Sequence, residues 1–243
     1  MRILLDRDRD CGAEAPDDAG AATREVTDDE LRAAYAVPRR PWLRANMIAT
    51  VDGAAAGPDG LTGSINNPPD HRIFGLLRTL ADAVVVGAGT LRAEEYGALR
   101  LPLVVVSRRG ALPPRLVDAP AGSVLMATCA AAPELQETRR TLGDDHVLVL
   151  GEESVSLPEL VPALAGRGLS SLLCEGGPSL LRDLLAAGVV DDLCATLVPR
   201  ITAGSQPRMA VGPDVDVPLD LRVLLDEDGT LLGRWEVRRD PAE

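Results

Sequence analysis

The sequence contains no lysine, so all 25 of its basic side chains belong to arginine. This absence excludes a Schiff-base lysine, a lysine anchor for pyridoxal phosphate and the lysine of a Walker phosphate loop. Any bound anion must instead be met by arginine, backbone N–H groups, hydroxyls or amides. Arginine without lysine also looks like codon bias. We favour that genomic origin, so the absence restricts the chemistry without indicating a function.

Aromatic residues and net positive charge are also missing. The five aromatic residues are too few to form a stacking platform for single-stranded nucleic acid. The net charge of −12 has the wrong sign for a partner made of many phosphates, because neutralising phosphates drives such binding. We therefore expect no nucleic-acid partner, whereas a single phosphorylated metabolite stays possible.

Clustered metal ligands and long apolar runs are absent as well. The cysteines, Cys11, Cys129, Cys174 and Cys194, are not paired at metal-binding spacing, and the sequence has only two histidines. We expect no metal site. The N-terminus lacks an apolar signal core, and no run of about 18 apolar residues occurs. These features predict a cytoplasmic protein without a membrane segment.

Short apolar runs rich in β-branched residues alternate with helical patterns. Such runs are typical of strands buried on both faces of a parallel sheet. The predicted strands are 44–50, 83–87, 101–107, 123–129, 146–151, 170–175 and 191–199, and the predicted helices are 68–81, 132–142, 157–165 and 178–187. The alternation predicts an α/β domain with a mostly parallel sheet. Residues 219–225 and 231–238 predict a hairpin that adds antiparallel edge strands.

The first 40 residues differ from the rest and predict a lead-in segment rather than a domain. Met1–Leu5 is expected to be a short strand and Glu14–Gly20 a loop. Asp28–Ala36 is expected to be a helix, because Thr27 and Glu30 have capping-box spacing. Residues 41–243 are then expected to form one domain.

Two glycine-rich turns, Gly87–Thr90 and Glu175–Ser179, follow predicted buried strands and open helices. Glycine allows close approach to a pyrophosphate, and a helix N-terminus supplies N–H donors. Neither turn has Rossmann spacing. A turn that merely needs a left-handed residue is the alternative. Ser107 and Arg108 follow another strand and suit the 2′-phosphate of NADP, the alternative being a solvated basic turn.

Further polar residues could contact a substrate. Asn46 and Thr50 are four residues apart on one strand and share a face, with Asp52 just beyond. Arg78 and Arg100 could hold a phosphate, although a surface position is the commoner fate of an arginine. The sequence has no G-x-S-x-G elbow, which argues against a serine hydrolase. Hydride transfer needs no protein nucleophile, because the cofactor carries the hard step.

Four segments in order, 46–53, 86–95, 173–181 and 190–193, together resemble the reductase domain of riboflavin biosynthesis. The resemblance covers roughly residues 41–238. It implies the dihydrofolate-reductase-like fold, a three-layer αβα arrangement with a mostly parallel central sheet and a C-terminal antiparallel hairpin. It also implies NADPH-dependent reduction of 5-amino-6-(5-phosphoribosylamino)uracil at C1′ of the opened ribose, and a homodimer.

The resemblance and the turns together predict a set of site residues. The expected catalytic residues are Asn46, Glu95 and Glu175. Substrate contacts are expected from Asn46, Asp52, Arg78, Arg100 and Glu175. Cofactor contacts are expected from Thr50, Gly87, Gly89, Thr90, Ser107, Arg108, Gly176, Gly177, Ser179 and Leu180. Asn46 stands where many bacterial members of the family have a lysine.

Residues 93–96 depart from the family, which usually has an aspartate followed by proline where this chain has Glu95 and Tyr96. This departure keeps two alternatives open: a dihydrofolate-type or other imine or carbonyl reductase, and a dinucleotide-binding protein without turnover. The deaminase signature, H-x-E with P-C-x-x-C, does not occur. We therefore expect reduction without deamination.

Overall fold

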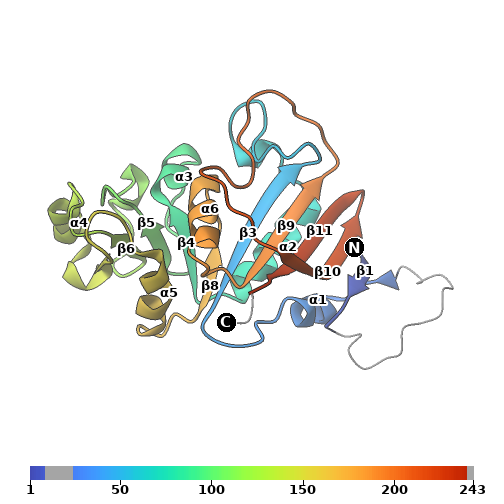
Figure 1. Ribbon diagram of the computed structural model, residues 1–243, viewed down its shortest axis with the longest axis horizontal. Coiled ribbons are helices and arrows are strands. Elements are labelled where there is room, and N and C mark those ends of the chain that lie inside the picture. Colours follow the sequence, from blue (N-terminus) through green and yellow to red (C-terminus); the bar gives the residue numbers. More distant parts are fainter. Residues whose placement is uncertain (9–23, 240–243) are drawn as a thin grey trace.

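The computed structural model describes residues 1–8 and 24–239 and is built around an 11-stranded sheet (Figure 1). The sheet order is β2-β1-β10-β11-β9-β3-β8-β4-β5-β6-β7. The strands are β1 (Arg2–Asp6), β2 (Arg24–Glu25), β3 (Trp42–Thr50), β4 (Ala83–Gly87), β5 (Leu103–Val106), β6 (Val124–Thr128), β7 (Val147–Val149), β8 (Ser171–Cys174), β9 (Asp192–Val198), β10 (Leu219–Glu227) and β11 (Thr230–Val237). The helices are α1 (Asp28–Ala34), α2 (Pro68–Thr79), α3 (Ala88–Ala93), α4 (Leu135–Leu142), α5 (Leu157–Ala165) and α6 (Pro178–Ala186).

The seven strands from β9 to β7 in this order are parallel, as predicted. Their apolar runs are buried on both faces: Val84, Val85 and Val86 of β4 are fully buried. β-Branched side chains fill the space between the sheet and the covering helices and lose little rotamer freedom in a strand. The parallel strands thus end together at one edge, where ligand sites of such sheets form.

Helices cover both faces of the parallel half, which confirms the three-layer prediction. α5 and α6 pack on one face through Leu160, Leu164 and Leu184. On the opposite face, α3 and α4 pack on β4–β6, and α1 and α2 pack on β8, β9 and the hairpin. The sheet is therefore the middle layer and separates the apolar cores (Figure 1).

The C-terminal hairpin, β10 and β11, is antiparallel as predicted, but it does not form the edge of the sheet. β1 pairs with the free side of β10, with Ile3 opposite Leu225, and β2 pairs with β1. The prediction of edge strands was wrong because the N-terminal segment supplies the hydrogen-bonding partner of β10. This pairing leaves the hairpin inside the sheet.

The N-terminal segment contributes a strand and a helix to this arrangement. The Thr27 hydroxyl accepts from the Glu30 N–H, and the Thr27 N–H donates to the Glu30 carboxylate, so the predicted capping box is confirmed. α1 ends at Ala34, two residues before the predicted end. The loop predicted at Glu14–Gly20 lies outside the described residues, and the domain division at residue 40 stays a prediction.

Membrane-spanning helices and metal-ligand clusters are both absent from the described residues. None of the helices there is long and apolar enough to cross a membrane. Residues 1–8 and 24–239 also contain no cluster of three or more His, Cys, Asp or Glu side chains able to hold a metal ion.

Candidate active site

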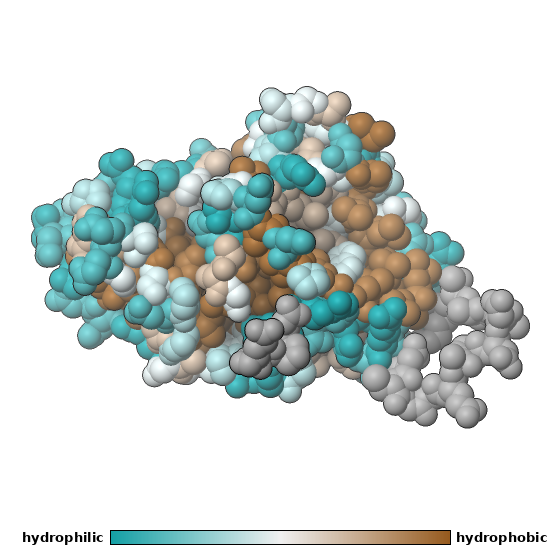
Figure 2. Space-filling view, viewed as in Figure 1, coloured by the Kyte–Doolittle hydropathy of each residue, from teal (hydrophilic) through white to brown (hydrophobic). Residues whose placement is uncertain are grey.

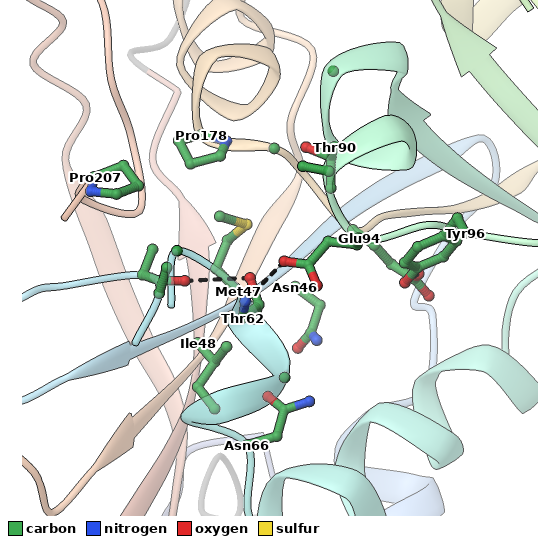
Figure 3. Close-up of a pocket in the computed structure, with 18 of the residues that line it drawn as sticks. Asn46, Met47, Ile48, Thr62, Asn66, Thr90, Glu94, Tyr96, Pro178 and Pro207 are labelled. Atoms are coloured by element: carbon green, nitrogen blue, oxygen red, sulfur yellow. Dashed lines mark hydrogen bonds between the residues drawn. The ribbon is translucent and has the colours of Figure 1, made fainter. Parts of the chain in front are cut away.

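A cavity of about 370 Å³ opens at the carboxyl ends of β3, β8 and β4 (Figure 3). β3 contributes Asn46, Met47 and Ile48 to its wall. The loop after β3, α2, both ends of α3, the turn after β8 and Pro207 supply the rest. Parallel strands place these separate segments at one sheet edge, so the cavity lies where the sequence predicts the ligand.

The two glycine-rich turns touch each other beside this cavity. The Gly87 N–H donates to the Gly176 carbonyl at 2.8 Å. A Cβ on Gly177 would lie 2.2 Å from the Thr90 hydroxyl oxygen, which is closer than real Cβ atoms come to other atoms. Gly176 has a φ of +88°, a left-handed conformation that L side chains rarely adopt. Glycine is therefore required at position 177 by the contact between the turns and at position 176 by the backbone conformation.

These turns fit the phosphates of a dinucleotide. Neither α3 nor α6 has a side-chain cap at its N-terminus, so N–H groups of their first turns stay available. A Cβ on Gly89, which lines the cavity, would meet no atom within 4 Å, so space is open there. Ser107 and Arg108 follow β5, next to the end of β4, because Gly87 pairs with Val106. Arg108 is exposed.

A buried carboxylate, Glu175, forms the centre of a polar cluster in the cavity wall. Its side chain is 3% exposed, and Arg78 binds it through two hydrogen bonds of 2.6 and 2.7 Å. The Tyr96 hydroxyl donates to the same carboxylate at 2.7 Å. Burial, and then the charge of Glu175, raise the pKa of Tyr96, which keeps it a donor. Three hydrogen bonds thus fix the position of the Glu175 carboxylate.

Arg78 is engaged by Glu175 rather than directed at the cavity, whose lining does not include it. Its guanidinium also lies over the Phe74 ring, 4.2 Å from the ring centre. Hydrogen bonding to Glu175 raises the pKa of Arg78 despite partial burial. Its charge is balanced by Glu175, a partner 97 residues away, and the expectation that Arg78 binds a substrate phosphate stays a prediction.

Three further polar side chains line the cavity, and the sequence analysis missed two of them, Asn66 and Asp70, altogether. Asp70 is 4% exposed and sits in the first turn of α2, where burial raises the pKa of its carboxyl. The side-chain oxygen of Asn66 is buried without a partner. Glu94 accepts a hydrogen bond from the Thr62 N–H at 2.8 Å (Figure 3). The sequence Asn67-Pro68-Pro69 marks the start of a helix, and acidic residues favour the first turn of a helix. This segment could therefore have indicated a structured position for Asp70.

All the residues that line the cavity fall within a range of the chain that matches a known family. The family model described as the RibD C-terminal domain matches residues 41–227, most of the chain. The chain belongs to the RibD C-terminal domain family.

Two curated relatives support this membership. A protein of Methanothermobacter thermautotrophicus is 30% identical over 210 residues, which cover 79% of this chain and 94% of the relative. A protein of Archaeoglobus fulgidus is 31% identical over 173 residues, covering 63% and 78% of the two chains. Both relatives are named 2,5-diamino-6-ribosylamino-4(3H)-pyrimidinone 5′-phosphate reductase.

A solved structure agrees with the sequence relatives. The crystal structure of a pyrimidine reductase-like protein from Corynebacterium diphtheriae superposes with a TM-score of 0.71 at 27% identity. The superposition covers 82% of this chain and 93% of that one. The RibD C-terminal domain family thus accounts for the fold as well as for the four sequence motifs.

Two residues expected in the site lie outside it in this RibD C-terminal domain. Glu95 has a φ of +51°, which directs its side chain away from the cavity, and it pairs with Arg115 on the surface. Glu94, one residue earlier, lines the cavity instead. Arg100 is exposed and does not line the cavity. The structure therefore does not place Glu95 or Arg100 in the cavity wall.

Thr50 and Asp52 stabilise the turn after β3 rather than lining the cavity. The Thr50 hydroxyl donates to Asp52 and accepts from the Ala54 N–H at 3.1 Å. Asp52 also accepts from the backbone N–H groups of Thr202 and Ala203. These bonds, that from Thr50 foremost, lower the pKa of Asp52. Of the predicted residues, the structure brings Asn46, Gly89, Thr90, Glu175 and Gly177 together in the cavity wall.

Proposed function

We propose that the protein is an NADPH-dependent reductase of a ribosylaminopyrimidine 5′-phosphate in riboflavin biosynthesis. The observation that carries this proposal is the meeting of two uncapped glycine turns with a polar cavity. Membership of the RibD C-terminal domain family and reductases among its relatives support it. A dihydrofolate-type reductase and a non-catalytic dinucleotide-binding protein are the competing functions.

The reaction adds a hydride to C1′ of the ring-opened ribose and a proton to the attached nitrogen. NADPH, when bound, would supply the hydride. We propose that Gly89, Thr90, Gly177 and the first turn of α6 hold its pyrophosphate and nicotinamide side. Because the chain has no lysine, N–H groups and hydroxyls would bind the negative charge of the pyrophosphate. The 2′-phosphate would then lie at Ser107 and Arg108.

Asn46 and Glu175 are proposed to face the substrate. Asn46 is 9% exposed and presents its amide to the cavity from the middle of β3 (Figure 3). An amide can donate and accept at once, so it suits the hydroxyls of an opened ribose. Glu175 is proposed to accept a hydrogen bond from the substrate with its remaining acceptor capacity, while Arg78 and Tyr96 hold its carboxylate in place.

We also propose a homodimer formed through the sheet face that α5 and α6 leave uncovered. Leu231 pairs with Leu197, and Trp235 pairs with Leu193, so all four side chains share this face. Leu231 is 37% exposed. Apolar residues gather on this part of the surface, over β9 to β11 (Figure 2). A self-complementary apolar patch of this kind favours pairing with a second copy.

The direct test follows NADPH absorbance with three substrates offered separately. These are the phosphoribosylaminouracil, its 2-amino counterpart and dihydrofolate. Oxidation with either ribosylaminopyrimidine supports the proposal, and oxidation with dihydrofolate alone favours the first competitor. Tight NADPH binding without any oxidation favours the second. Asn46→Ala is the matched variant, and it should impair turnover while NADPH binding stays near normal.

A further inference from the structure

The charged side chains in the cavity wall are all acidic. No arginine of the described chain lines the cavity, yet three acidic side chains do: Asp70, Glu94 and Glu175. Glu175 already accepts three hydrogen bonds. Asp70 and Glu94 form no ion pair with any residue that the structure describes. The orphaned side-chain oxygen of Asn66 adds a further acceptor without a donor. A complementary ligand must therefore bring several N–H donors.

Asp70 is the most firmly placed of these acceptors. Its own N–H donates to the Asn67 side chain at 3.1 Å, and the Asn67 amide in turn donates to the Thr230 hydroxyl at 2.7 Å. The Thr196 hydroxyl donates to the Asp70 carboxylate. One hydroxyl donor leaves most of the acceptor capacity of a carboxylate unused, and such capacity is costly to leave unpaired when it is buried.

We propose that Asp70 is a specificity-determining residue that selects a 2-amino-4(3H)-pyrimidinone base over a uracil. This inference rests on the proposed function, since both bases occur in substrates that carry the same phosphoribosylamino group. The 2-amino base presents two adjacent donors, its 2-amino group and N3–H. A carboxylate presents two acceptors at matching spacing and can receive both.

Uracil differs on this edge by one group, because a carbonyl oxygen replaces the 2-amino group. That oxygen would face a carboxylate oxygen, so one hydrogen bond is lost and two acceptors repel each other. A site built to pair a polar group discriminates strongly against an analogue that lacks the donor. Asn66 and Glu94 remain available to the 5-amino group, which the two bases share.

The test compares kcat/KM for the two ribosylaminopyrimidine phosphates in the wild-type protein and in Asp70→Asn. The wild type should prefer the 2-amino substrate by about tenfold to a hundredfold, the range of a lost charged hydrogen bond. An asparagine presents one acceptor and one donor, which matches N3–H and the 2-carbonyl of uracil. Asp70→Asn should therefore reverse the preference. Glu94→Gln is the matched control, which should affect both substrates alike and keep the wild-type preference.

A binding measurement separates this inference from the proposed function. Calorimetry with 2,5,6-triamino-4(3H)-pyrimidinone and 5,6-diaminouracil needs no turnover, and the same reversal between wild type and Asp70→Asn is expected. Absence of turnover with that reversal present would overturn the proposed function alone. A wild-type preference for uracil, or an unchanged ratio in Asp70→Asn, would overturn the role of Asp70. Unchanged NADPH affinity and melting temperature within a few degrees show that the variant is folded.

Discussion

Replacing Arg78 with methionine should destabilise the protein mainly by leaving Glu175 charged and without its partner. The Glu175 side chain is 3% exposed, and two of its three donors come from Arg78. Removing one member of a buried pair costs about 3–5 kcal/mol, because the remaining charge stays away from water. Arg78 is itself 28% exposed and Tyr96 keeps donating, so we expect about 3 kcal/mol.

Chemical denaturation measures this loss as a change in the free energy of unfolding. For a chain of this size, a loss of about 3 kcal/mol corresponds to a fall in melting temperature of about 6–12 °C. The double variant Arg78→Met/Glu175→Gln supplies the control. A neutral amide is cheaper to bury than a carboxylate, so the double variant should recover at least half of the loss.

The outcome of the double variant decides between two explanations. If it is as unstable as Arg78→Met alone, the buried charge is not the cause. The loss would then come from the packing of the Arg78 guanidinium on the Phe74 ring, and the reasoning about Glu175 would be refuted.

Four other predictions concern Asp70, the cofactor-binding turns and the proposed dimer face. Burial raises the pKa of Asp70 above its ordinary value of 3.8, so ionisation of this carboxyl opposes folding. Asp70→Asn should therefore raise the free energy of unfolding at neutral pH, and this gain should disappear as the pH falls through the raised pKa towards 3.8. A gain that does not depend on pH would contradict this cause. Gly177→Ala would place a Cβ 2.2 Å from the Thr90 hydroxyl oxygen and should weaken NADPH binding about tenfold or more in a fluorescence titration. An unchanged affinity for NADPH would count against this turn as the cofactor site. Leu231→Asp should convert a dimer to a monomer in light scattering, and an unaltered mass argues against the proposed face. Arg108→Ala should erode the preference for NADPH over NADH, and an unchanged preference rules out contact with the 2′-phosphate.

The sequence predicted those parts of the fold that depend on local signals. Runs such as Val84–Val86 are apolar and β-branched, so strand and burial follow from the residues themselves. The glycine turns also follow, because only glycine tolerates the close approach between Gly177 and Thr90. The edge position of the hairpin could not be predicted in this way. It depends on β1 pairing with β10 across more than 200 residues of sequence.

The candidate site was predicted only in part, because local signals place some of its residues and long-range contacts place the others. Asn46 and Glu175 lie on or directly after strands, so their place at the sheet edge follows from the topology. The pairing of Arg78 with Glu175 could not be predicted, because the two residues are remote in sequence. Glu94 was not predicted to line the cavity because α3 is followed by Glu95 in a left-handed conformation, and no glycine marks this position in the sequence. Asp70 was missed because its burial arises only in the folded protein, where its carboxyl meets the Thr196 side chain of β9.

Transfer of deuterium from labelled NADPH tests the central claim most directly. The protein is incubated with deuterated NADPH and the ribosylaminopyrimidine phosphates, and the products are examined by mass spectrometry and NMR. The proposed function predicts one deuterium atom at C1′ of a ribityl chain, with NADPH consumed in equal amount. No transfer to either substrate, or deuterium found elsewhere in the product, would contradict it.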